Sequence, residues 1–170
     1  MYLAIQIKVL KWADKVASTC IRRSDDEFFW GKSLDDDYVW VFTKFWGIRI
    51  PRNHVYIDVD AAQLKCSGVL RSIEEALLYD AKPVVVRDTY KTIIRSGQKK
   101  SPELMVFEAE TGEKAYVNRR QIKNAGIKDL DEFEIRVLDY KSPVGFFRDG
   151  ELVACVLPTH VNEEVDHGKE

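Results

Sequence analysis

The residues best placed for enzyme chemistry are two aspartates, Asp58 and Asp60, which lie two positions apart. They alternate with the apolar residues Val55, Ile57 and Val59, which is the pattern of a strand. Because successive side chains of a strand point to opposite faces, both carboxylates would share one face and could hold a divalent cation. The sequence lacks a third acidic ligand and a following lysine at nuclease-like spacing, so a solvated strand face is the alternative.

Other motifs for catalysis or metal binding are absent from the sequence. The chain contains no GxSxG, Walker A, GxGxxG or HExxH pattern. The cysteines and histidines are dispersed, without the short spacing of a local zinc site: Cys20, Cys66, Cys155, His54, His160 and His167. The cysteines are therefore interpreted as free buried thiols. We expect no catalytic residue, no metal ion and no cofactor.

Aromatic residues are concentrated between positions 28 and 46: Phe28, Phe29, Trp30, Tyr38, Trp40, Phe42, Phe45 and Trp46. Such rings could stack on single-stranded nucleic acid if they were exposed beside positive charge. Residues 24 to 46 carry five aspartates and Glu27 against Lys32 and Lys44, which is unfavourable for that role. Packing of these rings in the core is the preferred interpretation. A peptide-binding groove ranks second, ahead of stacking on nucleic acid.

Composition predicts one soluble globular domain without a membrane segment. The chain has 170 residues, of which 45% are hydrophobic and 32% charged, with a formal net charge of -2. No run of eighteen apolar residues occurs, and Lys8 and Lys11 interrupt the apolar character that a signal peptide would need. We therefore expect a cytoplasmic protein. Because the net charge is slightly negative, only a local cluster of positive charge could favour binding to nucleic acid.

Positive charge is concentrated in two segments of the chain. Residues 1 to 23 carry Lys8, Lys11, Lys15, Arg22 and Arg23 against a single acidic residue, Asp14. Residues 117 to 128 carry Arg119, Arg120, Lys123 and Lys128 and no acidic residue. Each segment therefore has a net charge of +4 in a protein of net charge -2.

The first part of the chain predicts a strand, a helix and three strands. Residues 2 to 7 are apolar enough for a strand, and apolar residues at a spacing of three and four predict a helix over 8 to 20. The acidic segment 24 to 37 predicts a loop. The three strands that follow are expected at 38 to 43, 47 to 50 and 55 to 59. In the first of them, side-chain alternation puts Tyr38, Trp40 and Phe42 on one face and Val39 and Val41 on the other.

The middle of the chain, about 61 to 101, predicts less regular structure. Ser72 and Glu75 form a capping-box pattern that predicts a short helix over 73 to 79. A short apolar strand is expected at 84 to 87, and the sequence SGQKKS at 96 to 101 predicts a loop.

The last third of the chain predicts strands, a short helix and a tight hairpin. Asn118 is expected to cap a helix that Gly126 closes in a left-handed conformation. Asp149 and Gly150 match a two-residue type I′ turn. The expected strands are 104 to 109, 114 to 117, 133 to 137, 144 to 147 and 152 to 157. The order strand, helix, three strands therefore occurs twice in the chain.

This repeated order resembles a domain of the bacterial DNA polymerase sliding clamp, the β clamp. MYLAIQIKVLKWADKVAS is similar to the start of a clamp domain, where a strand runs directly into a helix. YVNRRQIKNAGIKDLDEFEIRVLDYKSPVGFFRDGELVACVLPTHV is similar to the last half of the clamp's final domain, including its tail. The resemblance covers about 65 residues. It implies one α+β domain over 1 to 161, with an insertion around 61 to 101. The polar tail over 162 to 170 has only Val165 to bury and is expected to be disordered.

The resemblance also implies where partners would bind. The two basic helices would face double-stranded DNA without sequence preference, using Lys8, Lys11, Lys15, Arg22, Arg23, Arg119, Arg120 and Lys123. The pocket for partner peptides would include Val156, Leu157 and Pro158. The chain is shorter than a three-domain clamp subunit, so we expect an accessory or regulatory protein of DNA replication, for example from a phage, that is able to form a homo-oligomer.

Two alternatives remain open at this point. One is a small metal-dependent nuclease or other enzyme that uses Asp58 and Asp60. The other is a protein-interaction module that uses the aromatic segment 28 to 46. The leading hypothesis is a non-enzymatic protein that binds DNA or a replication partner.

Overall fold

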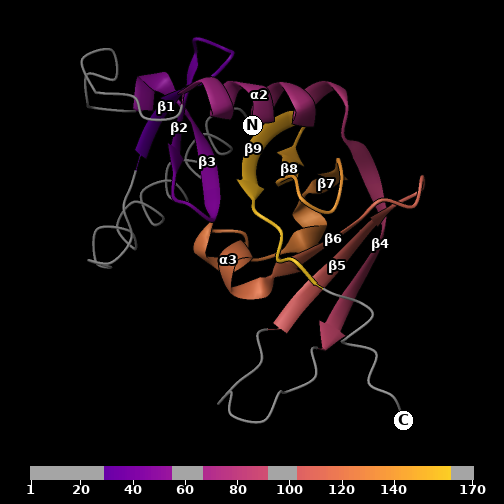
Figure 1. The fold of residues 1–170 in the computed structure, drawn as a ribbon. Coiled ribbons are helices and arrows are strands. Elements are labelled where there is room, and N and C mark those ends of the chain that lie inside the picture. The colour runs from indigo at the N-terminus through magenta and orange to yellow at the C-terminus, as the bar shows by residue number, and fades with distance from the viewer. Residues whose placement is uncertain (1–28, 55–66, 92–102, 162–170) are drawn as a thin grey trace, which may run out of the picture.

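The computed structural model describes residues 29–54, 67–91 and 103–161. In this part of the chain, nine strands form one antiparallel sheet in the order β1-β2-β3-β9-β8-β7-β4-β5-β6 (Figure 1). The strands are β1 (Phe29–Lys32), β2 (Tyr38–Phe42), β3 (Trp46–Pro51), β4 (Lys82–Lys91), β5 (Glu103–Ala109), β6 (Lys114–Asn118), β7 (Glu134–Val137), β8 (Val144–Arg148) and β9 (Glu151–Val156). The helices are α2 (Ser67–Tyr79), α3 (Arg119–Asn124) and two 3-10 turns, η1 (Arg52–His54) and η2 (Leu130–Glu132).

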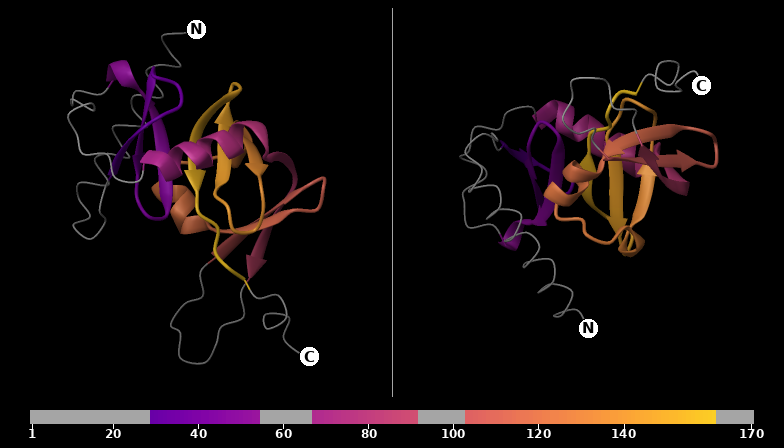
Figure 2. Two further views of the ribbon diagram at one scale, coloured as in Figure 1. Left: turned by 45° about the horizontal axis from the view of Figure 1, so that its top comes forward. Right: turned by 90° about the horizontal axis from the view of Figure 1, so that it is seen from below.

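The helix α2 covers one face of the strands β7, β8 and β9 (Figure 2). Its Leu77 is buried in a cluster with Phe147 of β8 and Leu152 of β9. The close approach of helix and sheet depends on Gly145, because a Cβ atom there would lie 3.1 Å from a methyl group of Leu77. A small residue at this strand position therefore sets the distance between α2 and β8.

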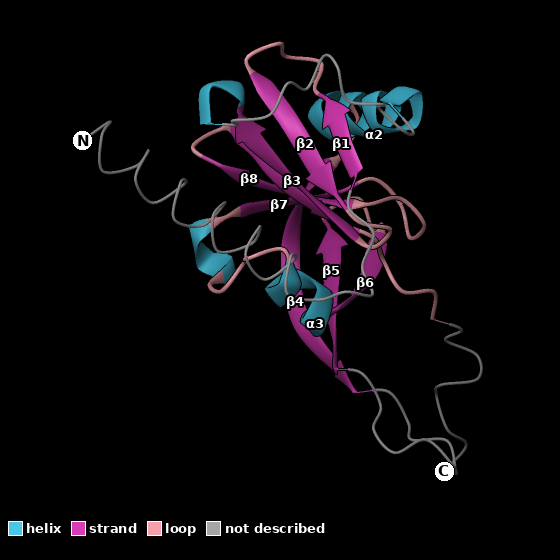
Figure 3. Ribbon diagram, turned by 90° about the vertical axis from the view of Figure 1, so that its left-hand side faces the viewer, coloured by secondary structure: helices cyan, strands magenta, loops and turns pink. Residues whose placement is uncertain are grey.

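The opposite face of the sheet carries the larger core, under β5, β6 and α3. Phe107 of β5 meets Phe146 of β8 edge to face, with ring centroids 6.2 Å apart. Two strands, β7 and β4, separate β5 from β8 in the sheet order, so this contact requires the sheet to curl back on itself. Figure 3 shows the end of the sheet formed by β4, β5 and β6 running away from α2.

The strand β4 is where the curl occurs. Its first residues, Lys82 and Pro83, pair with β7, and residues 84–91 pair with β5. The register shifts between Val84 and Val86, and a bulge of this kind bends a strand and increases its twist. Residues 67–91, within the expected insertion, thus supply both the helix on one face and the strand that joins the two ends of the sheet.

Several expectations for the last third are confirmed. The Asn118 side chain accepts a hydrogen bond from the Arg120 backbone N–H at 2.9 Å, which is the expected N-cap. Gly126 has φ of 81°, and Asp149 and Gly150 have φ of 51° and 80°, as the helix stop and the type I′ turn require. The element order β6, α3, β7, β8, β9 is the expected strand, helix and three strands.

Three predicted boundaries are wrong. The segment 24–37 is not all loop, because Phe29–Lys32 forms the edge strand β1 against β2. The helix predicted from 73 begins at Ser67, so Ser72 lies inside α2 rather than at its cap. The strand predicted over 84–87 extends over Lys82–Lys91. For β1 and β4, pairing with a neighbouring strand extends the element beyond its local sequence pattern.

The chain is thus a mixed α and β protein in which strands predominate. The strand at 2 to 7, the helix at 8 to 20 and the strand at 55 to 59 lie outside the described residues, as does the tail 162–170. Among the helices that the structure describes, none has the length and apolar character to cross a bilayer.

Candidate functional site

The structure describes one of the two basic segments expected to face DNA. Lys8, Lys11, Lys15, Arg22 and Arg23 lie outside the described residues. Arg119, Arg120 and Lys123 are exposed on α3. Arg119 pairs with Glu103, with Nη1 and Oε1 2.7 Å apart, and both side chains are about half exposed. How the two basic segments lie relative to each other therefore remains a prediction.

The short helix α3 is held in place by apolar residues on its inner side. Ile122 and Ala125 are buried in the larger core, and Ile127 follows them after the glycine turn. This anchoring turns Gln121 and the capping residue Asn118 toward a groove beside the segment that follows β9. The sequence pattern thus positions two amide side chains at the start of α3.

A groove of about 380 Å³ lies between α3, the turn from β2 to β3, and the segment that follows β9. Its lining residues are Lys44, Phe45, Asn118, Gln121, Leu157, Pro158 and Thr159. Leu157 and Pro158, expected in a partner-peptide pocket, therefore line a groove. Val156 does not, because it is fully buried in the core and pairs with Trp46.

Two exposed apolar side chains of the groove belong to segments that a backbone hydrogen bond joins. Phe45 is 40% exposed and Leu157 is 43% exposed. The Leu157 N–H donates to the Phe45 carbonyl at 2.8 Å, which joins the two segments. The Thr43 hydroxyl accepts from the N–H groups of Phe45 and Trp46, at 3.1 and 3.3 Å, and shapes the turn. The groove is therefore preformed.

The groove has a positive end and no carboxylate in its lining. The Lys44 ammonium lies 4.9 Å from the centroid of the Phe45 ring. Apolar surface beside a few polar groups is the usual composition of a ligand-binding cleft. With two exposed apolar residues and amide groups at one end, this groove can accept an apolar side chain of a partner and hydrogen bond to its backbone.

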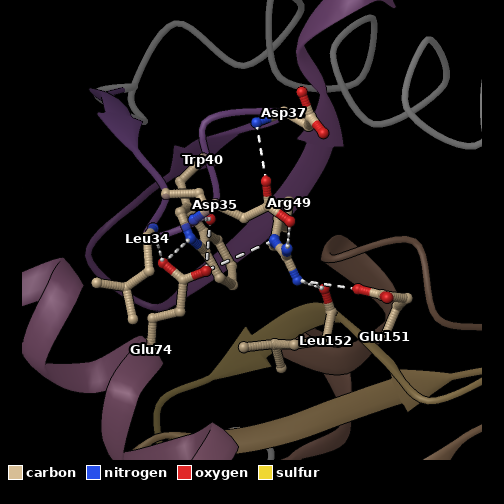
Figure 4. A network of polar contacts seen from close by, with 9 residues as sticks. Leu34, Asp35, Asp37, Trp40, Arg49, Glu74, Glu151 and Leu152 are labelled. Atoms are coloured by element: carbon tan, nitrogen blue, oxygen red, sulfur yellow. Dashed lines mark hydrogen bonds and ion pairs between the residues drawn. The ribbon is translucent and has the colours of Figure 1, made fainter.

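A second polar cluster lies between α2 and the sheet, and its two central side chains are buried (Figure 4). Glu74 of α2 is 0% exposed and Arg49 of β3 is 5% exposed. Glu74 accepts hydrogen bonds from the Ser33 hydroxyl at 2.5 Å, the Leu34 N–H at 2.9 Å and the Trp40 indole N–H at 3.1 Å. These contacts connect α2 to β2 and to the turn before it.

Arg49 completes this cluster. Its Nε lies 3.5 Å from Glu74 Oε1, and its Nη1 donates to the Leu152 carbonyl at 3.1 Å. Glu151 lies 3.6 Å from the same Nη1 and Asp35 lies 3.6 Å from Nη2, while the Arg49 guanidinium carbon lies 3.9 Å from the centroid of the Tyr38 ring. Because donors and counter-charges surround both side chains, the cluster serves to dock α2 rather than to react with a ligand.

The described cysteine is inert in this environment. Cys155 of β9 is a free buried thiol, as expected. Burial raises its pKa to about 12; the charge of Glu74 adds to the shift, and a hydrogen bond with the Gly47 backbone opposes it. Cys20 and Cys66 lie outside the described residues, as do Asp58 and Asp60 of the enzyme hypothesis. Within 29–54, 67–91 and 103–161, no three histidine, cysteine or acidic residues are grouped to hold a metal ion.

The aromatic segment divides between the core and the groove. Trp40 and Trp46 are buried, and Val39 and Val41 face the larger core while Trp40 packs under α2. The expected alternation of this strand is confirmed. Phe45 instead faces the groove, so the aromatic segment and the expected peptide pocket meet at one place.

Comparison with protein-family models, with curated proteins and with solved structures gives no match to this chain.

The sequence analysis missed Phe45, Asn118 and Gln121 as members of the groove, and Arg49 and Glu74 as a buried pair. Asn118 and Gln121 belong to a recognisable sequence pattern, but that pattern indicates a helix cap rather than a groove. Arg49 stands out in the sequence as a charged residue between Ile48 and Ile50 in an apolar strand. Its partner Glu74 lies 25 positions away, beyond the reach of any local pattern.

Proposed function

We propose that this chain is a non-enzymatic interaction domain, similar to a sliding-clamp domain, that binds a short peptide segment of a DNA replication partner. The groove at Phe45, Leu157 and Pro158 carries the proposal. Two of these residues belong to the tail that resembles the peptide pocket of the clamp, and they line a preformed groove with two exposed apolar side chains.

The chemistry of the groove favours a peptide over a small polar ligand. Phe45 and Leu157 offer apolar area that gains free energy when a partner side chain removes it from water, about 25 cal/mol per Å². Asn118 and Gln121 can donate to and accept from a peptide backbone. Since Phe45 and Leu157 are joined by a backbone hydrogen bond, little order has to be created on binding.

The test is a selection of binding peptides followed by titration. A phage-displayed library of random twelve-residue peptides is panned on the immobilised full chain, and selected peptides are titrated by fluorescence anisotropy. Phe45→Asp and Leu157→Asp should each weaken binding more than tenfold. The matched control is Leu34→Asp, since Leu34 is 40% exposed and lies outside the groove. If no peptide depends on Phe45 or Leu157, the proposal is wrong.

We also propose contact with double-stranded DNA through the exposed face of α3. Arg119, Arg120 and Lys123 are exposed, and residues 117–128 carry no acidic side chain. The ion pair of Arg119 with Glu103 is exposed, and such pairs contribute at most about 1 kcal/mol, so a phosphate can displace it. Lys8, Lys11, Lys15, Arg22 and Arg23 remain candidates for the same role.

Salt dependence tests the DNA proposal separately from the groove. Three phosphate contacts would give a slope of log affinity against log salt of about -2.7, and contacts from the N-terminal segment would steepen it. Replacing Arg119, Arg120 and Lys123 by Glu should abolish binding, whereas Lys141→Glu should not. Absence of duplex binding at low salt would exclude this second function.

A further inference from the structure

A second hollow of about 420 Å³ lies next to the groove and shares Thr159 with it. Its lining differs in chemistry, because it contains the rings of Tyr116, Tyr140 and His160 and the carboxylates of Glu113 and Asp139. The groove binds apolar groups beside a positive charge, whereas this second hollow combines aromatic rings with negative charge.

Both hollows lie along the short segment that follows β9. The Thr159 N–H donates to the Tyr116 carbonyl at 2.6 Å, so the segment after β9 lies along the outer edge of β6. Leu157 and Asn118 line the groove at one end of this run. Val161 and Lys114 line the second hollow at the other end, which indicates an antiparallel course of the two segments.

Side-chain alternation in β6 puts both hollows on one face. Ala115 and Val117 are fully buried in the larger core. Lys114, Tyr116 and Asn118 alternate with them and therefore point to the opposite face. Since Asn118 lines the groove and the other two line the second hollow, the two hollows form one surface with Thr159 in the middle.

The carboxylates of the second hollow are ionised at neutral pH. A hydrogen bond from the Thr111 hydroxyl, together with one from its own backbone N–H, lowers the pKa of Glu113. Burial would raise the pKa of Asp139, but hydrogen bonds from the Lys141 and Ser142 backbone N–H groups outweigh it and lower that pKa.

Lysines lie near these carboxylates: the charge of Lys82 contributes to the lowered pKa of Glu113, and that of Lys141 to the lowered pKa of Asp139. Lys114 Nζ lies 3.7 Å from Glu108, so its charge is already paired outside the hollow. Lys141 Nζ lies 5.1 Å from the centroid of the Tyr140 ring, which shows that this ring accepts a cation. Tyr140 and His160 stack with centroids 5.9 Å apart and form an aromatic wall.

We propose that the groove and the second hollow together bind one extended partner segment, with an apolar side chain in the groove and a lysine or arginine in the second hollow. This inference rests on the proposed peptide-binding function. It adds the charge of the ligand and the spacing between its two anchor residues. From Asn118 to Lys114 is four residues, so the anchors lie about 14 Å apart at roughly 3.4 Å per strand residue. The two anchor residues of the ligand should therefore be separated by three to five positions, in either order.

The panned peptides provide the test. Sequences that depend on Leu157 should be enriched in Lys or Arg three to five positions from their apolar anchor. The double variant Glu113→Gln/Asp139→Asn should weaken their binding about tenfold, the effect of losing one charge-assisted contact. Asp139→Asn keeps the oxygen that accepts from Lys141 and Ser142, because both bonds go to Oδ1.

A cycle of protein and peptide variants separates contact from structural damage. Replacing the basic residue of the peptide by Gln should weaken binding to the wild type about tenfold and have little further effect on the double variant. Asp131→Asn/Glu132→Gln, two exposed carboxylates outside both hollows, should change nothing.

The outcomes distinguish this inference from the function on which it rests. Peptides that need Phe45 and Leu157 but show no basic enrichment, or bind the double variant normally, would overturn the inference alone. Absence of any peptide that needs Phe45 or Leu157 would overturn both.

Discussion

Removing the charge of Glu74 tests how the helix α2 is attached to the sheet. In Glu74→Gln the side chain keeps its length, but the position of Oε1 or Oε2 becomes an amide NH₂ that cannot accept a hydrogen bond. The best orientation keeps the oxygen on Leu34 and Trp40 and lets the new NH₂ donate to the Ser33 hydroxyl. That orientation places the NH₂ against Arg49 Nε, which is buried and makes no hydrogen bond within the described residues.

The expected cost is about 3 kcal/mol. Breaking a buried ion pair by removing one partner costs about 3–5 kcal/mol, because the remaining charge is buried without compensation. Arg49 keeps two counter-charges at 3.6 Å, Asp35 and Glu151, but both are at least half exposed and compensate weakly. The lower end of the range therefore applies.

Urea unfolding followed by tryptophan fluorescence measures this change, and Trp40, which donates to Glu74, adds a local signal. The midpoint should fall while the m-value stays constant. The control is Glu132→Gln, which breaks the exposed pair with Arg148 and should cost at most about 1 kcal/mol. Arg49→Met combined with Glu74→Gln should be more stable than the sum of the single effects by about 1 kcal/mol or more.

The reasoning is refuted if Glu74→Gln costs no more than Glu132→Gln. It is also refuted if the effects of Glu74→Gln and Arg49→Met simply add, since the two side chains would then not interact.

Three further predictions concern single residues. Gly150→Val should lower stability by about 1 kcal/mol or more because φ is 80°, while Gly150→Asn should cost less; equal melting temperatures would contradict this. Asn118→Ala should cost about 1 kcal/mol in urea unfolding through loss of the cap of α3, and circular dichroism should show the fold retained. Burial raises the pKa of Cys155 to about 12 in the folded protein, above the ordinary value of 9.0, so its stabilising effect is complete below pH 9 and lost as the pH rises toward 12. Cys155→Ala should have a lower free energy of unfolding at pH 7. Above pH 9 its free energy of unfolding should fall less steeply than that of the wild type, by up to about 1.4 kcal/mol per pH unit. Parallel pH profiles of the two proteins would exclude this linkage.

Local chemistry was sufficient for the predicted features of the last third. The Asn118 cap, the Gly126 stop and the Asp149–Gly150 turn depend on residues within a few positions of one another, and all three are present. The alternation in β2 was predicted for the same reason, because the side-chain period of a strand is a local property.

The candidate site could be predicted only in part. The tail sequence indicated Leu157 and Pro158, but Phe45 was interpreted with the core aromatics, and no local rule distinguishes it from Trp46 beside it. The difference is tertiary, because Trp46 pairs with Val156 inside the sheet, while the Phe45 carbonyl accepts from the Leu157 N–H just beyond the ends of the strands β3 and β9.

The sequence by itself determined the turns, the cap of α3 and the two-sided character of the strands, since these follow from backbone conformation and the period of the side chains. Only the tertiary structure decided that residues 82–91 join the main sheet, that Arg49 meets Glu74, and that Phe45 meets Leu157. Phe45 and Leu157 are 112 positions apart in the chain. Contacts at such separations depend on how the sheet is ordered and curled, which is a property of the whole chain rather than of any segment.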